Sequence, residues 1–222
     1  MSDPHRRSVP DAERRRFLAR GVQAAGAVSL VGLLLASHAK QAQSRPVAAL
    51  RPPSALPEDE FLGACVRCGL CVRDCPFDTL RLATFGEPLA TGTPYFIARD
   101  IPCEMCEDIP CVAACPTTAL SKDLTDIRAA DMGVAVVTGT DTCYSITGMG
   151  RCMACYNACP VKDDAITMEL KQEHGRVFFV PTVHRDHCTG CGKCEADCIY
   201  PEAAIKVLPR ALVRHDVGPD LA

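Results

Sequence analysis

Sixteen cysteines account for most of the chemistry that this chain of 222 residues could perform. From Cys65 to Pro76 the sequence reads CVRCGLCVRDCP, with the spacing C-x2-C-x2-C-x3-C-P. This run is typical of proteins that hold 4Fe-4S clusters, where three close thiolates bind one cluster and the fourth binds another. The run therefore predicts an iron–sulfur centre.

The pattern recurs three more times, so an internal repeat governs the architecture. The second copy has two extra residues before its third cysteine, and the third copy has a longer gap after its first. In the fourth copy the usual proline is displaced to Pro201. We predict that all the cysteines are ligands of four 4Fe-4S clusters. They are Cys65, Cys68, Cys71 and Cys75; Cys103, Cys106, Cys111 and Cys115; Cys143, Cys152, Cys155 and Cys159; and Cys188, Cys191, Cys194 and Cys198.

Two other uses of cysteine compete with this interpretation. Exported proteins often carry disulfide frameworks, but such frameworks have no reason to repeat this spacing. A lone C-x2-C pair is also common in structural zinc sites, but the third close cysteine and the trailing proline argue against zinc. His184 and His187 precede Cys188, and we expect them to have a surface or hydrogen-bonding role because four cysteines are already at hand.

Short elements must position these cysteines. Apolar and β-branched runs predict strands at 95–98, 133–138, 166–170, 177–180 and 205–208. The sequence around Glu173-His174-Gly175 predicts a hairpin. We expect brief helices after the fourth cysteine of each motif, as at 123–130. The sequence therefore predicts an α+β, ferredoxin-like domain, duplicated, over residues 61–209, with a C-terminal tail over 210–222.

The N-terminal part has the features of an export signal. Residues 14–18 read RRRFL, and an apolar stretch runs from Gly21 to Ser37. The twin arginine predicts a twin-arginine signal segment over residues 1–39, whose receptor accepts folded cargo, with cleavage after Ala39. A permanent membrane anchor is the alternative, although the apolar run is short for spanning. Residues 40–60 are rich in proline and predict an extended tether.

Charge and composition exclude some classes of function. Aromatic residues make up 5% of the chain and tryptophan is absent, so metal binding would supply much of the folding free energy. The formal net charge is −3, and acidic residues outnumber basic ones beyond the signal segment. Nucleic acid is therefore a poor partner.

Four stretches carry a resemblance to a known family: RPPSALPEDEF, TPYFIARDIPCEMCEDIPC, FVPTVH and CTGCGKCE. With the signal segment and the four motifs, residues 14 to about 209 resemble the MauM/NapG family, the ferredoxin-type components of periplasmic nitrate reductase systems. The resemblance implies electron transfer from an integral-membrane, NapH-like quinol dehydrogenase. The eventual acceptor would be a periplasmic cytochrome or nitrate reductase. The MauM branch, which is linked to methylamine oxidation, shares this layout.

Cluster-binding proteins of this kind pair their motifs, and spacing does not decide whether the pairing is sequential or nested. The first and fourth motifs have matched spacing, which favours nesting. A resemblance to four-cluster subunits of respiratory molybdenum enzymes points the same way. The nested prediction joins Cys65, Cys68 and Cys71 with Cys198; Cys188, Cys191 and Cys194 with Cys75; Cys103, Cys106 and Cys111 with Cys159; and Cys143, Cys152 and Cys155 with Cys115.

Two classes of function remain open from the sequence. In the first, the chain is an electron-transfer subunit without substrate chemistry of its own, in which the clusters carry the charge. In the second, it is an assembly module that stabilises a partner reductase, and its clusters serve structure.

Overall fold

The computed structural model describes residues 15–23, 26, 29–33, 49–173 and 175–213. The chain divides into two compact units, Met1–Pro46 and Val47–Ala222. In the first unit, residues 15–23 and 29–33 are helical. No helix among the described residues is long and apolar enough to cross a membrane. Arg14 and the expected cleavage site after Ala39 lie outside the described residues.

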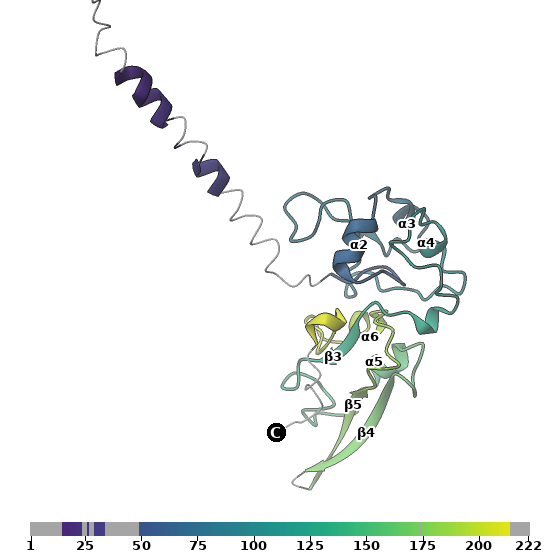
Figure 1. Ribbon diagram of the computed structural model, residues 1–222. Coiled ribbons are helices and arrows are strands. Elements are labelled where there is room, and N and C mark those ends of the chain that lie inside the picture. The colour runs from purple at the N-terminus through teal and green to yellow at the C-terminus, as the bar shows by residue number, and fades with distance from the viewer. Residues whose placement is uncertain (1–14, 24–25, 27–28, 34–48, 174, 214–222) are drawn as a thin grey trace, which may run out of the picture. The chain divides into compact units, whose positions relative to one another are not determined.

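The second unit is built from short helices and short antiparallel strands, which confirms the α+β class (Figure 1). Its elements are, in order, α2 Glu58–Ala64, α3 Leu70–Arg73, β1 Arg81–Leu82, β2 Pro94–Tyr95, α4 Pro110–Ala113, η1 Ile127–Ala129, β3 Val134–Val137, α5 Ala154–Ala158, β4 Ile166–Glu173, β5 Arg176–Val183, α6 Lys193–Ala196, β6 Ile205–Leu208 and η2 Arg210–Leu212. Within the described residues the strands form three two-stranded sheets, β1–β2, β3–β6 and β4–β5.

The shortest helices have one place in each motif. Each of α3, α4, α5 and α6 begins one residue before the third cysteine and ends before the fourth. The prediction that helices follow the fourth cysteine is therefore wrong. The turn between the third and fourth cysteines is helical because Pro110 supplies the fixed φ of a first helical residue in α4, and left-handed Gly69 and Gly192 precede α3 and α6. The helix expected at 123–130 is reduced to the single turn η1.

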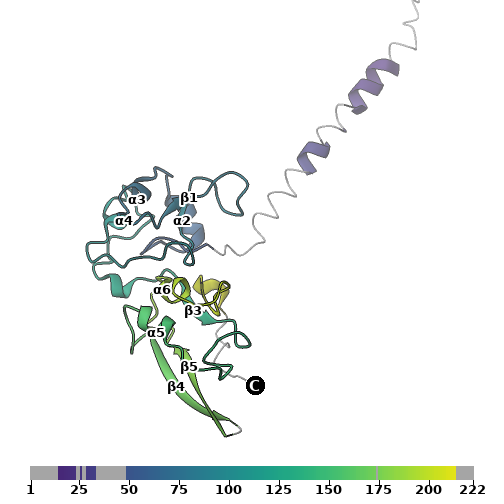
Figure 2. The ribbon, with the colours of Figure 1, turned by 180° about the vertical axis from the view of Figure 1, so that it is seen from behind.

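The strands follow the sequence pattern more closely. Strand β6 has the predicted bounds, and β3 lies within the predicted range. Strands β4 and β5 pair in one register from Ile166 with Val183 to Glu173 with Arg176, so the hairpin is confirmed and is longer than expected. Strand β2 ends at Tyr95, short of the predicted range. Both ribbon views show β4 and β5 as a ribbon beside α5 (Figure 2).

The proline-rich segment expected as a tether over 40–60 packs against the body from Ala49 onward. Leu50 forms an antiparallel bridge with Phe96, and Ala55 forms one with Leu120. Ala49 and Leu50 are buried because their apolar side chains meet the core, so the tether prediction is wrong for 49–60. Residues 40–48 lie outside the described residues. The expected tail also starts too early, because η2 covers 210–212.

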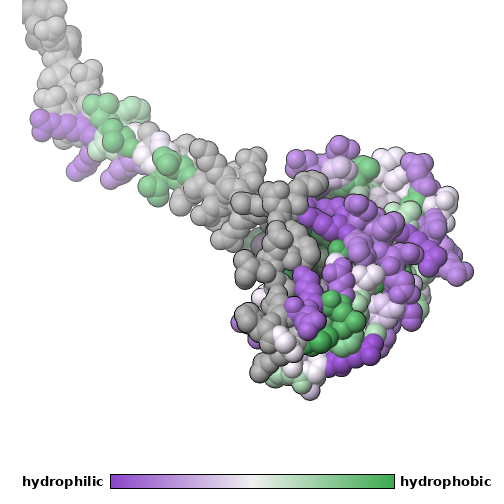
Figure 3. Space-filling view, turned by 90° about the horizontal axis from the view of Figure 1, so that it is seen from below, coloured by the Kyte–Doolittle hydropathy of each residue, from purple (hydrophilic) through white to green (hydrophobic). Residues whose placement is uncertain are grey.

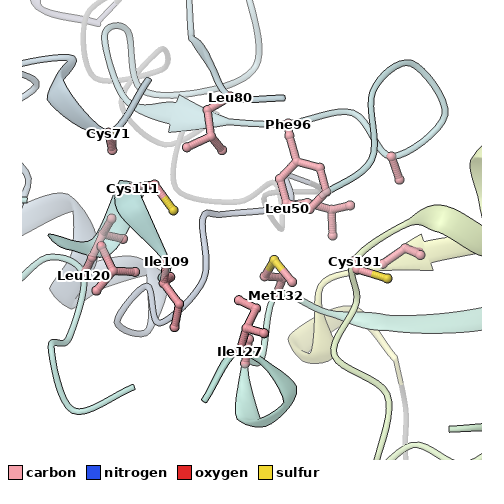
Figure 4. Packing of buried hydrophobic residues seen from close by; sticks show 14 of the residues in the cluster. Leu50, Cys71, Leu80, Phe96, Ile109, Cys111, Leu120, Ile127, Met132 and Cys191 are labelled. Carbon is pink, nitrogen blue, oxygen red and sulfur yellow. The ribbon is translucent and has the colours of Figure 1, made fainter. Parts of the chain in front are cut away.

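One hydrophobic core runs through the second unit and includes cysteines. Phe61, Phe96 and Leu120 are among its largest fully buried side chains. Burying each of them contributes about 2 kcal/mol. Figure 4 shows the buried Cys71, Cys111 and Cys191 among the aliphatic and aromatic side chains of this core. The fold therefore buries five of the cysteines in apolar surroundings, whereas Cys68 is exposed and the others are partly buried.

The described surface is mostly hydrophilic on the face shown in Figure 3, with smaller hydrophobic areas between the polar ones. This surface agrees with the low content of large apolar residues and with a formal net charge of −3. The cysteines, rather than a broad apolar face, are therefore the feature that a functional site must explain.

Candidate iron–sulfur centres

The first two motifs exchange their fourth cysteines. One apolar cavity is lined by Cys65, Cys68 and Cys71 of the first motif together with Cys115 of the second. We call this set of four the first group. A second cavity is lined by Cys103, Cys106 and Cys111 together with Cys75, which form the second group. Each group thus takes three thiols from one motif and one from the other.

The last two motifs repeat this exchange. A cavity beside β3 and β5 is lined by Cys143, Cys152, Cys155 and Cys198, which form the third group. The fourth group is Cys188, Cys191, Cys194 and Cys159. Burial raises the pKa of Cys159 most, and the nearby Cys191 and Cys188 raise it further. Burial likewise raises the pKa of Cys194, and Cys159 is one of the thiols that add to this shift. The structure therefore brings all the predicted site residues together in four sets of four.

This arrangement contradicts the nested prediction. Cys75 lies with Cys103, Cys106 and Cys111 instead of with the fourth motif, and Cys198 lies with the third motif instead of with the first. Each motif pairs with a neighbour in the chain: the β1–β2 pair lies in the connection between the first and second motifs, and the β4–β5 hairpin lies between the third and fourth. Matched spacing between the first and fourth motifs reflects only the local loop geometry.

Burial dominates the electrostatics of the thiols. It raises the pKa of Cys71 to about 11 and the pKa of Cys103, Cys111 and Cys155 to about 12. Neighbouring thiols of the same group add to each shift, as Cys65, Cys115 and Cys68 do for Cys71. In the protein without a metal these thiols stay protonated at neutral pH. Binding of a metal centre must therefore displace protons.

Backbone N–H groups point at several of the sulfur atoms. The N–H of Ala135 donates to Cys188 Sγ and that of Ala204 donates to Cys198 Sγ, each at 3.4 Å. The N–H groups of Val72 and Val112 act in the same way on Cys71 and Cys111 and partly offset the effect of burial on the pKa. Such bonds stabilise a thiolate and tune the potential of an iron–sulfur cluster.

The donor set fits a cluster with several irons. All sixteen cysteines are free thiols. Among the described residues, no three His, Cys, Asp or Glu side chains are close enough to hold one metal ion together. Each group can offer four thiolates to a larger centre, and the cavities of the first three groups have mostly apolar walls. His184 lies outside the groups, where its Nε2 is 2.9 Å from Thr167 Oγ1, in agreement with the hydrogen-bonding role expected for it.

The four groups follow one another through close cysteine pairs. Burial and the thiols of its own group raise the pKa of Cys111 in the second group most, and Cys71 of the first group adds to this shift. Cys191 of the fourth group does the same to Cys103 of the second, and the backbone N–H of Cys103 donates to the carbonyl of Cys191 at 2.8 Å. Cys155 of the third group adds to the raised pKa of Cys194 in the fourth. The order in space is therefore first, second, fourth and third.

The sequence analysis did not identify some of the residues that surround the four groups. Thr117 Oγ1 lies 3.6 Å from Cys115 Sγ, and its place directly after the Cys-Pro pair could have suggested a contact. Arg99 and Gly192 lie where the segment before the second motif meets the fourth motif, and only the fold brings those parts of the chain together.

Comparison with known proteins agrees with this geometry. The profile of the 4Fe-4S dicluster domain family matches residues 64–119 and 150–201, which hold the first, second and fourth motifs and all of the third except Cys143. The chain therefore contains two dicluster domains, and its cysteines are consistent with several 4Fe-4S clusters. No solved structure matches the chain.

Curated relatives extend the match to nearly the whole length. The chain is 55% identical over 199 residues to the "Methylamine utilization ferredoxin-type protein MauM" of Methylorubrum extorquens, covering 90% of each chain. It is 49% identical over 218 residues to the "Ferredoxin-type protein NapG" of Escherichia coli, covering 96% of this chain and 93% of that protein. MauM of Paracoccus denitrificans is 48% identical over 199 residues. With two dicluster domains and relatives of this similarity along most of its length, the chain belongs to the MauM/NapG family of ferredoxin-type electron-transfer proteins.

Proposed function

We propose that this chain is an electron-transfer subunit in which the sixteen cysteines hold four 4Fe-4S clusters. The observation that carries the proposal is the exchange of fourth cysteines, which produces four complete sets of thiols. Bound clusters would supply one-electron redox chemistry. The chain supplies the thiolates, the N–H donors that tune them and the apolar walls that exclude water.

The metal content tests this proposal. Protein purified without oxygen should contain about sixteen irons and about sixteen sulfides per chain, because each group should hold one cubane. Stoichiometric zinc without sulfide would contradict it. Reduction by a quinol-linked membrane partner, followed by reoxidation, distinguishes electron transfer from an assembly role. Clusters that stay redox-silent while a partner reductase loses stability without this chain would favour the assembly role.

The proposed electron donor is an integral-membrane, NapH-like quinol dehydrogenase, and the proposed acceptor is a periplasmic cytochrome or nitrate reductase. What supports this direction is the similarity to NapG along nearly the whole chain. The higher identity to MauM favours methylamine oxidation as the second candidate pathway. A strain without the gene should lose either anaerobic growth on nitrate or growth on methylamine, and the lost phenotype identifies the pathway.

We further propose export to the periplasm by the twin-arginine route, since clusters are inserted before transport and this route carries folded cargo. The supporting observation is Arg14-Arg15 followed by an apolar stretch. Replacing both arginines by lysine should leave cluster-loaded protein in the cytoplasm. Unchanged delivery to the periplasm would show that the signal is read by another route.

A further inference from the structure

The two dicluster domains meet along the segment that leads into the second motif. There the backbone N–H of Cys103 donates to the carbonyl of Cys191 at 2.8 Å. Gly192 lies so close to this segment that a Cβ on it would be 2.5 Å from the Cβ of Ala98. Lys193 pairs with Glu104 across the same junction. Residues 98–104 and 191–193 therefore form one tightly packed contact, which we call the junction.

Arg99 extends from the junction into the second dicluster domain. Its Nη1 donates to the carbonyls of Glu195, Ala196 and Cys198 at 2.6, 2.9 and 3.0 Å. Its Nη2 donates to the carbonyl of Tyr200 at 2.6 Å. One half-buried guanidinium thus binds four carbonyls that lie about a hundred residues away in the sequence.

Arg99 adds hydrogen bonds that the short helix cannot supply. Helix α6, Lys193–Ala196, is a single turn, so its last carbonyls have no partner within the helix, although the carbonyl of Glu195 also accepts from the N–H of Cys198 at 3.3 Å. A planar guanidinium presents several N–H groups in a fixed fork, so one arginine can satisfy several carbonyls at once. Lysine has the same charge but lacks this fork. Arg99 of the first dicluster domain therefore caps the C-terminal end of α6 in the second.

The capped segment carries a cysteine that another motif needs. Cys198 lies in the middle of the four carbonyls and lines the cavity of the third group with Cys143, Cys152 and Cys155. Its Sγ accepts from the N–H of Ala204 at 3.4 Å. A shift of residues 195–200 would move this sulfur away from the other three thiols. The three remaining thiols come from the third motif, which Arg99 does not touch in any of these contacts.

We propose that Arg99 is a positioning residue for the third group: it holds the segment that presents Cys198. The proposal rests on the proposed binding of clusters by the cysteines. It gives the first dicluster domain control over a site in the second, so that the third group is complete only when the two domains are docked. Arg99 itself makes no bond to sulfur.

Arg51 provides the matched control. It is a buried arginine, whereas Arg99 is half-buried, and it likewise donates four hydrogen bonds, to Glu58, to Thr93 and to the carbonyl of Pro94. All of these bonds stay within the first dicluster domain and its leading segment. Arg51→Ala therefore removes a comparable set of bonds without touching residues 195–200.

The test compares Arg99→Ala, Arg99→Lys, Arg51→Ala and Cys198→Ser in the full chain, purified without oxygen. Two properties are measured: iron per chain with its electron paramagnetic resonance spectrum, and the rate at which iodoacetamide labels each cysteine.

Arg99→Ala should reproduce Cys198→Ser, with a loss of about one iron and a three-iron signal. Cys198 should be labelled at least about tenfold faster than in the wild type, while Cys115 keeps its rate. Arg99→Lys should lie closer to Arg99→Ala than to the wild type.

Unchanged iron, spectrum and Cys198 labelling in Arg99→Ala would overturn the proposal. A uniform loss of iron from all groups, matched by Arg51→Ala, would also overturn it, because it would show general destabilisation. If Arg99→Ala gives no folded protein, Arg99→Lys decides by the same two measurements. Failure of the proposed function is recognised separately, since the wild type would then hold no clusters, and the labelling of Cys198 would still test Arg99.

Discussion

Cys68 and Cys191 are each the second cysteine of a C-x2-C-x2-C-x3-C run, one in the first dicluster domain and one in the second. Cys68 is exposed, whereas Cys191 is only 7% exposed. Ala98 lies against Gly192 and Gly133 lies against Gly190, on either side of Cys191, each with atoms within 3.0 Å of an added Cβ. Among the described residues, the only atom within 4 Å of a Cβ added at Gly69, beside Cys68, is Leu82 Cδ1 at 3.4 Å. Identical spacing therefore produces similar loops, and the place of each loop in the fold decides its solvent exposure.

The difference has a consequence for the proposed clusters. Solvent exposure is one of the factors that set the reduction potential of an iron–sulfur cluster, together with hydrogen bonds to sulfur. The first group lies at one end of the series of groups and is open to solvent at Cys68, whereas the fourth group lies inside the series. We therefore expect the first group, at the exposed Cys68, to be a better place for contact with a redox partner than the fourth group, which lies at the junction.

The largest effect is expected at the junction itself. Gly192 has φ +90, and a Cβ on it would lie 2.5 Å from the Cβ and 3.0 Å from the Cα of Ala98. Gly192→Ala adds backbone strain and a clash with Ala98, so the free energy of unfolding should fall on the order of 3 kcal/mol or more. Denaturant unfolding followed by circular dichroism measures the change.

Gly86 is the control for this prediction, because it has φ +98 but no atom within 4 Å of an added Cβ. Gly86→Ala should cost only the strain of a left-handed residue, about 1–2 kcal/mol. Equal losses in the two variants would show that the junction is not tightly packed.

A smaller effect, on a labelling rate, compares the exposed Cys68 with the buried Cys191 directly. Wild-type protein is incubated with a chelator and iodoacetamide, and labelled peptides are counted by mass spectrometry at increasing times. Cys68 should be labelled faster than Cys191 by on the order of tenfold, because access limits the reaction of a buried thiol. In denaturant the two rates should become equal. Equal rates in the folded protein would remove the distinction between the two domains.

The smallest effect is expected for the ion pair across the junction. Lys193 and Glu104 are partly exposed, so their pair should contribute about 1 kcal/mol or less. A double-mutant cycle with Lys193→Met and Glu104→Gln measures this coupling. The pair of Lys206 and Glu202, in which Glu202 is 86% exposed, is the comparison and should give a smaller value. A larger coupling for the second pair would contradict the idea that the junction shelters its charges.

The sequence predicted the local features of the fold well. The alternation of apolar residues located β3 and β6 and the β4–β5 hairpin, because strand patterns depend on neighbours in the chain. It placed the helices on the wrong side of the fourth cysteine, since a four-residue helix has too few residues to show a helical period.

The site was predicted as a set of residues but not as an arrangement. Spacing identified all sixteen cysteines as candidate ligands, because the spacing within each motif depends on local loop geometry. The choice of partner motif depends on how the chain returns on itself, and similar spacing in the first and fourth motifs gave the wrong partner. The role of Arg99 was invisible for the same reason, because its four carbonyl partners follow it by about a hundred residues.

Sequential exchange of fourth cysteines is the central claim, and one measurement tests it most directly. Iron per chain and the electron paramagnetic resonance spectrum are recorded for a variant with Cys65→Ser and Cys68→Ser, which should lack the first cluster, about four irons. Adding Cys115→Ser should change neither property, because Cys115 belongs to the same group. Adding Cys198→Ser should lower the iron further and introduce a three-iron signal. The reverse result, with Cys198→Ser silent and Cys115→Ser damaging a second cluster, would contradict the account.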